Sequence, residues 1–325
     1  MSPMLREVEM RQWSVGSPAH PDEVRQVLGR IMAEAQLKGF VVRTADGAAV
    51  HAMATGTGPS VVFIHGSGSP GLFWLPVLQH LESVRAVVVD RPGFGLSEPV
   101  APAATSKETA VGWIDRLLDA LELPSAILVG HSMGGLWSLR FALARPERVR
   151  GLAMLGAPSL PGTQAPLPYR LMGTPGVGPL ISRQRETPKS VRQFARMVGE
   201  GDTIGAHPAM VDLLVAVGND PVAGRALHEE VRALISPAAL LSRSGFRRRA
   251  RITEADLQGV EVPTLLLVGD RDPVGGADVA RRHQSLIPHS ELKVFNGGHA
   301  PWLGQPHQVA SVLADWVQRV DANRT

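Results

Sequence analysis

Cysteine is absent from this sequence of 325 residues, and charged and aromatic residues contribute only 19% and 5% of it. The absence of cysteine excludes disulfides, thiolate metal sites and a cysteine nucleophile. No uninterrupted apolar run approaches the roughly 20 residues that a membrane-spanning helix requires. The first residues lack a basic segment followed by an apolar run, so they do not resemble a secretory signal peptide. We therefore expect a cytoplasmic protein with no membrane span.

The excess of positive charge is also small for a chain of this length. The formal net charge of +3 gives no reason to expect a nucleic-acid partner. The sequence pI near 9.8 still leaves room for a local basic face. A hydrophobic fraction of 44% is that of an ordinary globular protein. The length indicates one enlarged domain or a core with an inserted lobe.

Short apolar runs separated by helical patterns dominate the chain from residue 39 onward. The first two runs alternate like an antiparallel pair, and the later runs are continuous and rich in β-branched residues. Continuous runs indicate strands buried on both faces of a parallel sheet. The runs lie at 39–43, 49–54, 61–65, 86–90, 126–130, 152–156, 264–269 and 292–295, and the helical patterns at 105–121, 132–144, 277–286 and 306–320. Thr105 and Glu108 form a candidate capping box at the start of the first of these helices. The alternation predicts an α/β fold with a doubly wound, mostly parallel, eight-stranded sheet.

Two segments stand outside this alternation. Residues 1–38 form an N-terminal extension, in which apolar residues at helical spacing predict an amphipathic helix that packs on the body of the protein; a dimer contact or a lid is the alternative. Residues 160–259 contain no convincing strand and predict an inserted helical cap. Its helices are expected near 188–199, 208–217 and 222–241. The sheet core then comprises 39–159 and 260–325, and the cap overhangs the carboxyl ends of the strands, where open α/β sheets bind ligands.

The sequence Gly130-His131-Ser132-Met133-Gly134 directly follows an apolar run and opens a helical pattern. This is the context that a nucleophile elbow requires, with small residues two positions before and after a serine in a strained conformation. We therefore expect Ser132 to be a nucleophile; the alternative is a buried helix-capping serine. The side chain of His131 is expected to point away from the pocket and to pack.

A serine nucleophile needs a base, an acid that orients the base, and donors for an oxyanion. His299 follows the last apolar run and precedes the last helix, which is where the histidine belongs. Asp270 and Asp272 both follow the run that ends at Val268, and either carboxylate could face the histidine. The backbone N–H of Met133 is one expected oxyanion donor, and that of Ser67, in the glycine-rich segment at 65–68, is the other. No Gly-Lys-Ser/Thr follows that segment, which argues against a phosphate loop.

Taken together, these motifs resemble the capped α/β-hydrolase superfamily in order and spacing. They are HGSGS at 65–69, DRPGFGLS at 90–97, GHSMGG at 130–135, GDRDP at 269–273 and GGHAPW at 297–302. The resemblance implies that Asp272, rather than Asp270, is the acid of the triad. Haloalkane dehalogenases and epoxide hydrolases of that superfamily use aspartate at the elbow, so Ser132 argues against both.

These features favour a serine hydrolase that cleaves a carboxylic ester, thioester or lactone through an acyl-Ser132 intermediate, with no cofactor and no metal. The alternatives are a carbon–carbon bond hydrolase of ring-cleavage products, a lyase or haloperoxidase-like enzyme, and a ligand receptor. The expected partner is a small acyl substrate, and the apolar cap favours acyl chains of medium length. Nothing in the sequence indicates an oligomeric state.

Further residues are candidates for the substrate pocket. Gly66, Trp74 and Trp302 belong to segments that approach the site. The apolar cap residues that could line an acyl pocket are Leu167, Leu171, Met172, Leu180, Met210, Leu213, Leu214 and Val217. The arginines between Arg247 and Arg251 form either a solvated face or a surface for an acidic partner such as an acyl carrier protein.

Overall fold

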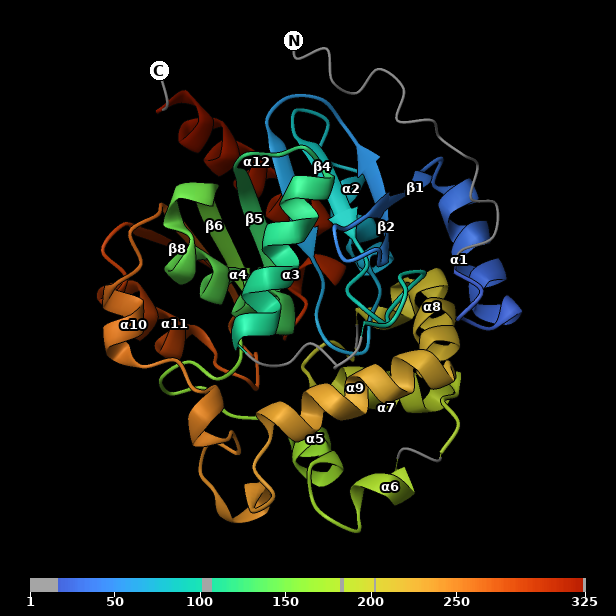
Figure 1. Ribbon diagram of the computed structural model, residues 1–325. Coiled ribbons are helices and arrows are strands. Elements are labelled where there is room, and N and C mark those ends of the chain that lie inside the picture. The colour runs from blue at the N-terminus through green and yellow to red at the C-terminus, as the bar shows by residue number, and fades with distance from the viewer. Residues whose placement is uncertain (1–16, 101–106, 182–183, 202, 324–325) are drawn as a thin grey trace.

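The computed structural model describes residues 17–100, 107–181, 184–201 and 203–323. Eight strands form one sheet in the order β1-β2-β4-β3-β5-β6-β7-β8, which confirms the predicted fold class (Figure 1). The strands are β1 (Lys38–Arg43), β2 (Ala49–Thr55), β3 (Ser60–Ile64), β4 (Arg85–Val89), β5 (Ala126–His131), β6 (Val149–Leu155), β7 (Thr264–Gly269) and β8 (Ser290–Phe295).

The direction of each strand follows from its sequence pattern. β1 and β2 pair antiparallel around a turn in which Gly47 takes a φ of +84°, and β2 also runs antiparallel to β4. From β4 to β8 every neighbouring pair is parallel. The continuous runs of β3 to β7 are mostly buried as predicted, and all six residues of β5 are buried. The run in β8 is half exposed, because β8 is the edge strand of the sheet and Val294 is 42% exposed. Parallel pairing places the carboxyl ends of β3, β5, β7 and β8 at one edge, so the loops that follow these strands meet there.

Helices cover both faces of the sheet. α3 (Lys107–Ala120) and α4 (Met133–Ala144) pack on one face, with α10 (Glu254–Gln258) and α11 (Ala277–Leu286) at its far end. The short α2 (Leu75–Leu78) and the long α12 (Pro306–Ala322) pack on the other face. Figure 1 shows α3 and α4 in front of the sheet and α12 behind it. Thr105 of the candidate capping box lies outside the described residues.

The α-helices that follow β6 and precede α10 form a separate layer over the carboxyl edge of the sheet (Figure 1). They are α5 (Leu167–Met172), α6 (Gly178–Ile181), α7 (Pro188–Met197), α8 (Pro208–Gly218) and α9 (Pro221–Leu234). The third cap helix was expected at 222–241, but α9 ends at Leu234. Ile235 is extended and pairs with Phe246, and the proline after Ser236 disfavours helical backbone at Ser236. The two short helices α5 and α6 were not predicted.

The predicted N-terminal helix is present as α1 (Asp22–Glu34). Its buried residues Val24, Leu28 and Ile31 join the core on the α12 face of the sheet, and the helix contacts both α8 and β1. It therefore packs on the body of the protein and connects the cap to the sheet edge. Within the described residues, no helix combines the length and apolar character needed to cross a bilayer.

Candidate active site

Ser132 occupies the sharp turn between β5 and α4. Its φ of 51° and ψ of −118° are strained for a residue with a side chain, and its N–H donates to the carbonyl of Leu155 (2.7 Å). A Cβ on Gly130 would lie 2.5 Å from the carbonyl oxygen of Gly134, and one on Gly134 would lie 2.2 Å from that of Ile64. Only glycine fits at both positions, so the sequence GxSxG forms this turn and presents the serine at the start of α4.

His299 and Asp272 lie in the loops after β8 and β7 and contact each other. Nδ1 of His299 lies 3.0 Å from both carboxylate oxygens of Asp272, whose side chain is 1% exposed. Asp270 instead accepts the N–H of Gly297 (3.0 Å), and its side chain is 44% exposed. The structure therefore brings Asp272, and not Asp270, to the histidine.

The contact between His299 and Asp272 requires a glycine at position 156, directly after β6. The φ of Gly156 is +60°, and a Cβ there would lie 2.7 Å from the ring of His299 and 2.9 Å from the carboxylate of Asp272. The loop after β6 thus leaves room for the pair and supplies no acid of its own.

The electrostatics around His299 favour its protonated form. Burial opposes the charge, but the Asp272 carboxylate, its hydrogen bond and the charge of Glu200 outweigh burial and raise the pKa of His299 above its ordinary value. Because Nδ1 faces Asp272, Nε2 is the nitrogen left to exchange a proton.

Glu200, which sequence reasoning missed, holds the histidine loop from the cap side. Its Oε1 accepts the N–H groups of Gly298 (2.9 Å) and Ala300 (2.8 Å), and its Oε2 accepts the hydroxyl of Thr203 (2.7 Å). The N–H of His299 donates to the carbonyl of Val198 (2.9 Å). Burial raises the pKa of Glu200 and outweighs these hydrogen bonds, which lower it. Glu200 lies in a short segment after α7 with no sequence motif around it, so no local signal indicated this role.

The loop after β3 lies against the elbow, and its hydrogen bonds orient one peptide. A Cβ on Gly66 would lie 3.0 Å from Cβ of Ser132. The carbonyl of Gly66 accepts from Nδ1 of His65 (2.7 Å) and from Nη2 of Arg91 (2.9 Å). In a trans peptide the carbonyl and the following N–H point in opposite directions, so the N–H of Ser67 points away from Arg91.

His65 is a neutral part of this arrangement. Its Nε2 accepts the backbone N–H of Arg91 (2.8 Å), which leaves Nδ1 as the protonated nitrogen that donates to Gly66. Burial, followed by the charge of Arg91, lowers the pKa of His65 to about 3.

A buried ion pair connects this loop to the cap. Arg91 stacks over the rings of Phe94 and Trp137, and its guanidinium pairs with Glu230 of α9. Glu230 also accepts the hydroxyl of Ser67 (2.6 Å). The arginine is fully buried and the glutamate nearly so. The sequence analysis included Arg91 only as part of the motif at 90–97 and did not name Glu230.

A cavity of about 40 Å³ lies between these core groups and the cap. The core contributes Ser67, Ser132, Met133 and His299 to its lining, together with Pro158 and Val274. The cap contributes Ala165, Pro166, Tyr169, Glu230, Val231, Leu234, Ile235 and Phe246. The lining is mostly apolar, and no Lys or Arg of the described chain belongs to it. Its size corresponds to about three water-sized groups.

Several residues expected at the pocket lie elsewhere. Trp74 and Trp302 are buried and stacked on each other at 4.5 Å, and Nε1 of Trp302 donates to the carbonyl of Phe73. They pack against the ring of His131, which is buried and faces the carbonyl of His299 (3.1 Å). Gly66 contacts the elbow but does not line the cavity.

The apolar cap residues also need correction. Met210, Leu213 and Val217 of α8 pack in the core with α1, whereas α9 and the segment after it line the cavity. Leu167 is mostly exposed, and the side chain of Leu180 lies outside the described residues. Within the described residues, no three His, Asp or Glu side chains gather as a metal site would require.

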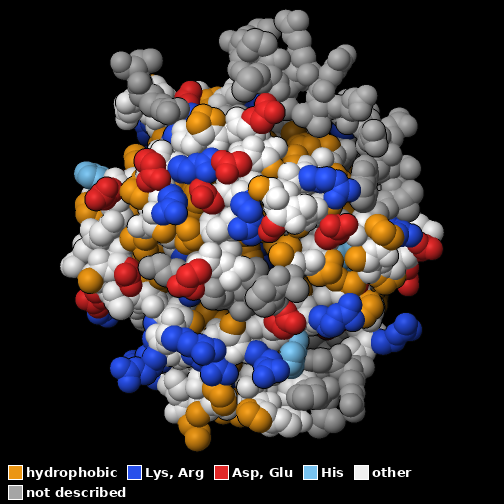
Figure 2. Space-filling view, viewed as in Figure 1, with side chains coloured by type: hydrophobic (Ala, Val, Ile, Leu, Met, Phe, Trp, Pro, Cys, Tyr) orange, Lys and Arg blue, Asp and Glu red, His pale blue; other side chains and the backbone are white. Residues whose placement is uncertain are grey.

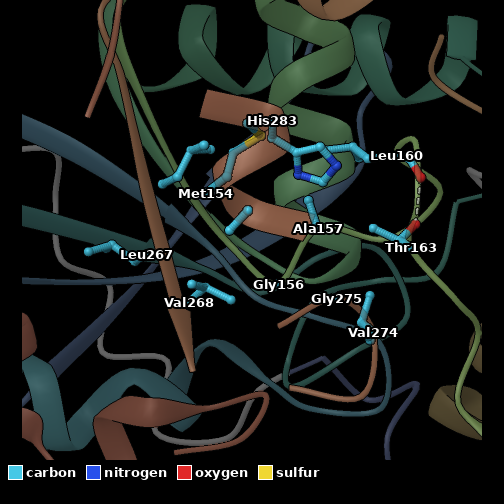
Figure 3. Close-up of a pocket in the computed structure, with 12 residues that line it drawn as sticks. Met154, Gly156, Ala157, Leu160, Thr163, Leu267, Val268, Val274, Gly275 and His283 are labelled. Atoms are coloured by element: carbon cyan, nitrogen blue, oxygen red, sulfur yellow. Dashed lines mark hydrogen bonds between the residues drawn. The ribbon is translucent and has the colours of Figure 1, made fainter. Parts of the chain in front are cut away.

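A second, smaller cavity of about 30 Å³ lies behind the loop that carries Asp272 (Figure 3). Apolar side chains such as Met154, Leu160 and Val274 surround it, together with His283. His283 faces the carbonyl of Pro161 (2.8 Å), and burial lowers the pKa of its imidazole. Of the residues described for the Ser132 site, Gly156 and Val274 line it, and the side chains of Ser132, Asp272 and His299 do not, so we regard it as a packing void.

The fold and the elbow are those of the α/β-hydrolase superfamily. The chain belongs to it, since the family described as alpha/beta hydrolase fold matches residues 59–304. Among curated proteins it is similar to a 2-hydroxy-6-oxononadienedioate/2-hydroxy-6-oxononatrienedioate hydrolase of Cupriavidus pinatubonensis, with 30% identity over 78% of this chain and 85% of that protein. It is also similar to a pimeloyl-[acyl-carrier protein] methyl ester esterase of Xanthomonas axonopodis, with 28% identity over 83% of this chain and 100% of that protein.

Solved structures agree on the fold. Carboxylesterase CesB of Bacillus subtilis matches with a TM-score of 0.71 at 23% identity, over 90% of this chain and 96% of that one. A meta-cleavage product hydrolase of Pseudomonas fluorescens matches with a TM-score of 0.68 at 20% identity, over 86% and 97%. Enzymes that carry names of two different reactions thus share this architecture.

Proposed function

We propose that this protein hydrolyses an uncharged carboxylic ester, thioester or lactone through a covalent acyl-Ser132 intermediate. One observation carries the proposal: Ser132 and His299 line one cavity, and Asp272 is bonded to the far nitrogen of the histidine. A nucleophile, a base and an orienting acid in this arrangement are the parts that acyl transfer requires.

In the proposed reaction, Oγ of Ser132 attacks the carbonyl carbon while Nε2 of His299 takes the serine proton. The N–H groups of Met133 and Ser67 donate to the resulting oxyanion, and the amino end of α4 adds a favourable dipole. The imidazolium then gives its proton to the leaving alcohol or thiol, which departs and leaves the acyl-enzyme. Water, deprotonated by His299, then attacks the acyl carbon; the bond to Oγ of Ser132 breaks, the imidazolium returns the proton to Oγ, and the acid is released. The mechanism uses no metal and no organic cofactor.

A carbon–carbon bond hydrolase is the second candidate, because one relative at 30% identity carries that kind of name. The substrates named for that relative are dicarboxylates. The cavity of this chain presents the carboxylate of Glu230, and the neighbouring Arg91 is already paired with it. Bringing a dianion to this lining would bury like charges without a free cation, which is unfavourable. The charge distribution therefore supports an uncharged substrate.

A substrate screen separates the two candidates. It compares p-nitrophenyl esters of increasing acyl length, lactones, a carrier-bound methyl ester and a vinylogous diketone dicarboxylate, each with wild type and Ser132→Ala. We expect hydrolysis of at least one ester or lactone and none of the diketone. A higher kcat/KM for the diketone would overturn the proposed substrate class in favour of the second candidate.

The same screen tests the acyl length. The cavity beside Ser132 has room for only a small group, so a longer acyl chain either extends out of it or displaces the wall formed by α9 and Ile235. We expect kcat/KM to be highest for short acyl groups in solution. A maximum at medium chain lengths would instead agree with the preference that the apolar composition of the cap predicts.

A further inference from the structure

The loop at 236–246 displays two leucines at the surface of the cap. The side chain of Leu240 is 49% exposed and that of Leu241 is 93% exposed. Leaving a leucine in water forgoes the favourable burial that this residue makes in a core. Single exposed apolar residues are ordinary on protein surfaces, whereas these two adjacent leucines form one small contiguous apolar patch at the turn.

The fold braces this loop, so the leucines are held outward by structure. The guanidinium of Arg170 donates to the carbonyls of Ala239 (3.1 Å), Ser242 (2.8 Å) and Arg243 (2.8 Å). The N–H of Ser236 donates to the carbonyl of Gly245 (2.9 Å), and Ala239 is fully buried beneath the turn. These three hydrogen bonds from the partly buried Arg170 fix the backbone that carries Leu240 and Leu241.

Arginines without carboxylate partners in the described chain occur on α9 and in and after this loop. They are Arg225 and Arg232 on α9, and Arg243, Arg247, Arg248, Arg249 and Arg251 in and after the loop. Within the described chain none of them forms an ion pair with a carboxylate. Partial burial and the charges of Arg249 and Arg232 lower the pKa of Arg247, so these side chains lie close enough to repel one another. Figure 2 shows Lys and Arg side chains gathered over the part of the cap where Figure 1 places α9 and the following loop.

The base of the loop is also a wall of the catalytic cavity. Ile235 and Phe246 pair across the base, and both line the cavity beside Ser132. One braced element therefore carries an apolar tip, a basic rim and the wall that limits the size of the cavity. A partner that binds the leucine tip would therefore bind the same loop whose base lines the cavity.

We propose that the loop at 236–246, with its leucine tip and its basic rim, is a docking site for an anionic lipid surface. The leucines enter the boundary between headgroups and acyl chains, and the arginines bind the anionic headgroups. An acidic protein would satisfy the same charges. However, two leucines on one turn give too little apolar area for the core of a stable protein interface, whereas shallow insertion adds to the attraction between the arginines and anionic headgroups. This inference concerns binding alone and does not depend on the reaction proposed above.

Vesicle co-sedimentation tests the proposal. One set of vesicles is phosphatidylcholine, and in the other set phosphatidylglycerol replaces part of it. We expect binding to the anionic set at low salt, weak binding to the neutral set, and loss at high salt, because salt screens exposed charges. Arg248→Gln and Arg249→Gln should each weaken binding about fivefold. Leu241→Ser should weaken it about tenfold.

Matched controls lie far from the tip. Arg145→Gln removes an exposed arginine at the end of α4, and Val294→Ser removes an exposed apolar residue on β8; neither should change binding. The proposal is overturned if wild type binds neither set of vesicles, or if the controls weaken binding as much as the tip variants. Binding of purified acyl carrier protein through these arginines, with no vesicle binding, would also overturn it in favour of an acidic protein partner.

Discussion

The carboxylate of Glu230, on cap helix α9, accepts the hydroxyl of Ser67 at 2.6 Å in the loop beside the nucleophile. The same carboxylate pairs with Arg91, which donates to the carbonyl of Gly66. The cap thereby holds both ends of the Gly66–Ser67 peptide, whose N–H is a proposed oxyanion donor. The position of α9 is therefore coupled to the orientation of the Ser67 N–H through the side chains of Glu230, Ser67 and Arg91.

We predict that Ser67→Ala lowers kcat about tenfold and leaves KM nearly unchanged. The change keeps the backbone donor but frees the loop from Glu230, and oxyanion contacts act mainly in the transition state. Steady-state kinetics on the best ester of the screen measure it. An effect on KM alone would assign the Ser67 hydroxyl to substrate binding instead.

Glu230→Gln separates positioning from stability. It leaves Arg91 buried beside an uncharged amide, which should lower the free energy of unfolding by about 3 kcal/mol. The double variant Arg91→Met/Glu230→Leu should regain much of that stability, while kcat stays low because the Gly66–Ser67 peptide has lost its partners. Urea unfolding and kcat are measured for both variants. Recovery of kcat together with stability would show that the pair is only structural.

Glu200→Gln is predicted to move the pH dependence of the reaction. The charge of Glu200 contributes to the raised pKa of His299. Its removal should therefore shift the acid limb of the kcat/KM profile to lower pH, because the neutral base then persists further into acid. We also expect a loss of kcat between tenfold and about 100-fold from a looser histidine loop. The profile is measured against Glu229→Gln, an exposed neighbour of Glu230, and an unshifted limb would contradict the electrostatic role.

Asp272→Asn and Asp270→Asn form a matched pair in one loop. Asp272 contacts Nδ1 of His299, whereas Asp270 bonds a backbone N–H and is partly exposed. Loss of the orienting carboxylate should cost on the order of 10⁴ in kcat, and loss of the exposed one should cost little. Equal losses, or a larger one at Asp270, would reverse the assignment.

A buried histidine at the entrance to α1 predicts how stability depends on pH. Nδ1 of His20 faces the carboxylate of Asp220, and Nε2 faces the carbonyl of Ser97 (2.8 Å). The carbonyl and an ionised carboxylate both accept, so this arrangement favours the doubly protonated ring. Burial opposes this charge, but the bonds to Asp220 and Ser97 and the charge of Asp220 outweigh it and raise the pKa of His20.

A raised pKa in the folded state stabilises the fold below the unfolded value of about 6.5, and the stabilisation is lost as pH rises through the folded pKa. The difference in unfolding free energy between wild type and His20→Gln should therefore be largest in mild acid and should shrink toward alkaline pH. Urea titrations across this range measure it. A difference that is constant, or that grows with pH, would show that His20 is neutral in the fold.

The sequence predicted what local pattern encodes. Continuous β-branched runs predicted the parallel strands, and the glycines around Ser132 predicted a turn that accepts nothing larger. The contact between Asp272 and His299 joins two loops that the order of the motifs had singled out. Long-range partners were invisible, because Arg91 and Glu230 are 139 positions apart and each is unremarkable alone. Trp302 was expected to contact the substrate, but its indole N–H donates to the buried carbonyl of Phe73 instead.

The most direct test of the central claim is the intact mass of the protein after treatment with a fluorophosphonate, followed by peptide mapping. We predict a single stoichiometric adduct on Ser132 in wild type and none in Ser132→Ala, which should fold normally and lose about 10⁴ to 10⁶ in kcat. An adduct on another residue, or full ester hydrolysis by Ser132→Ala, would contradict the proposed mechanism.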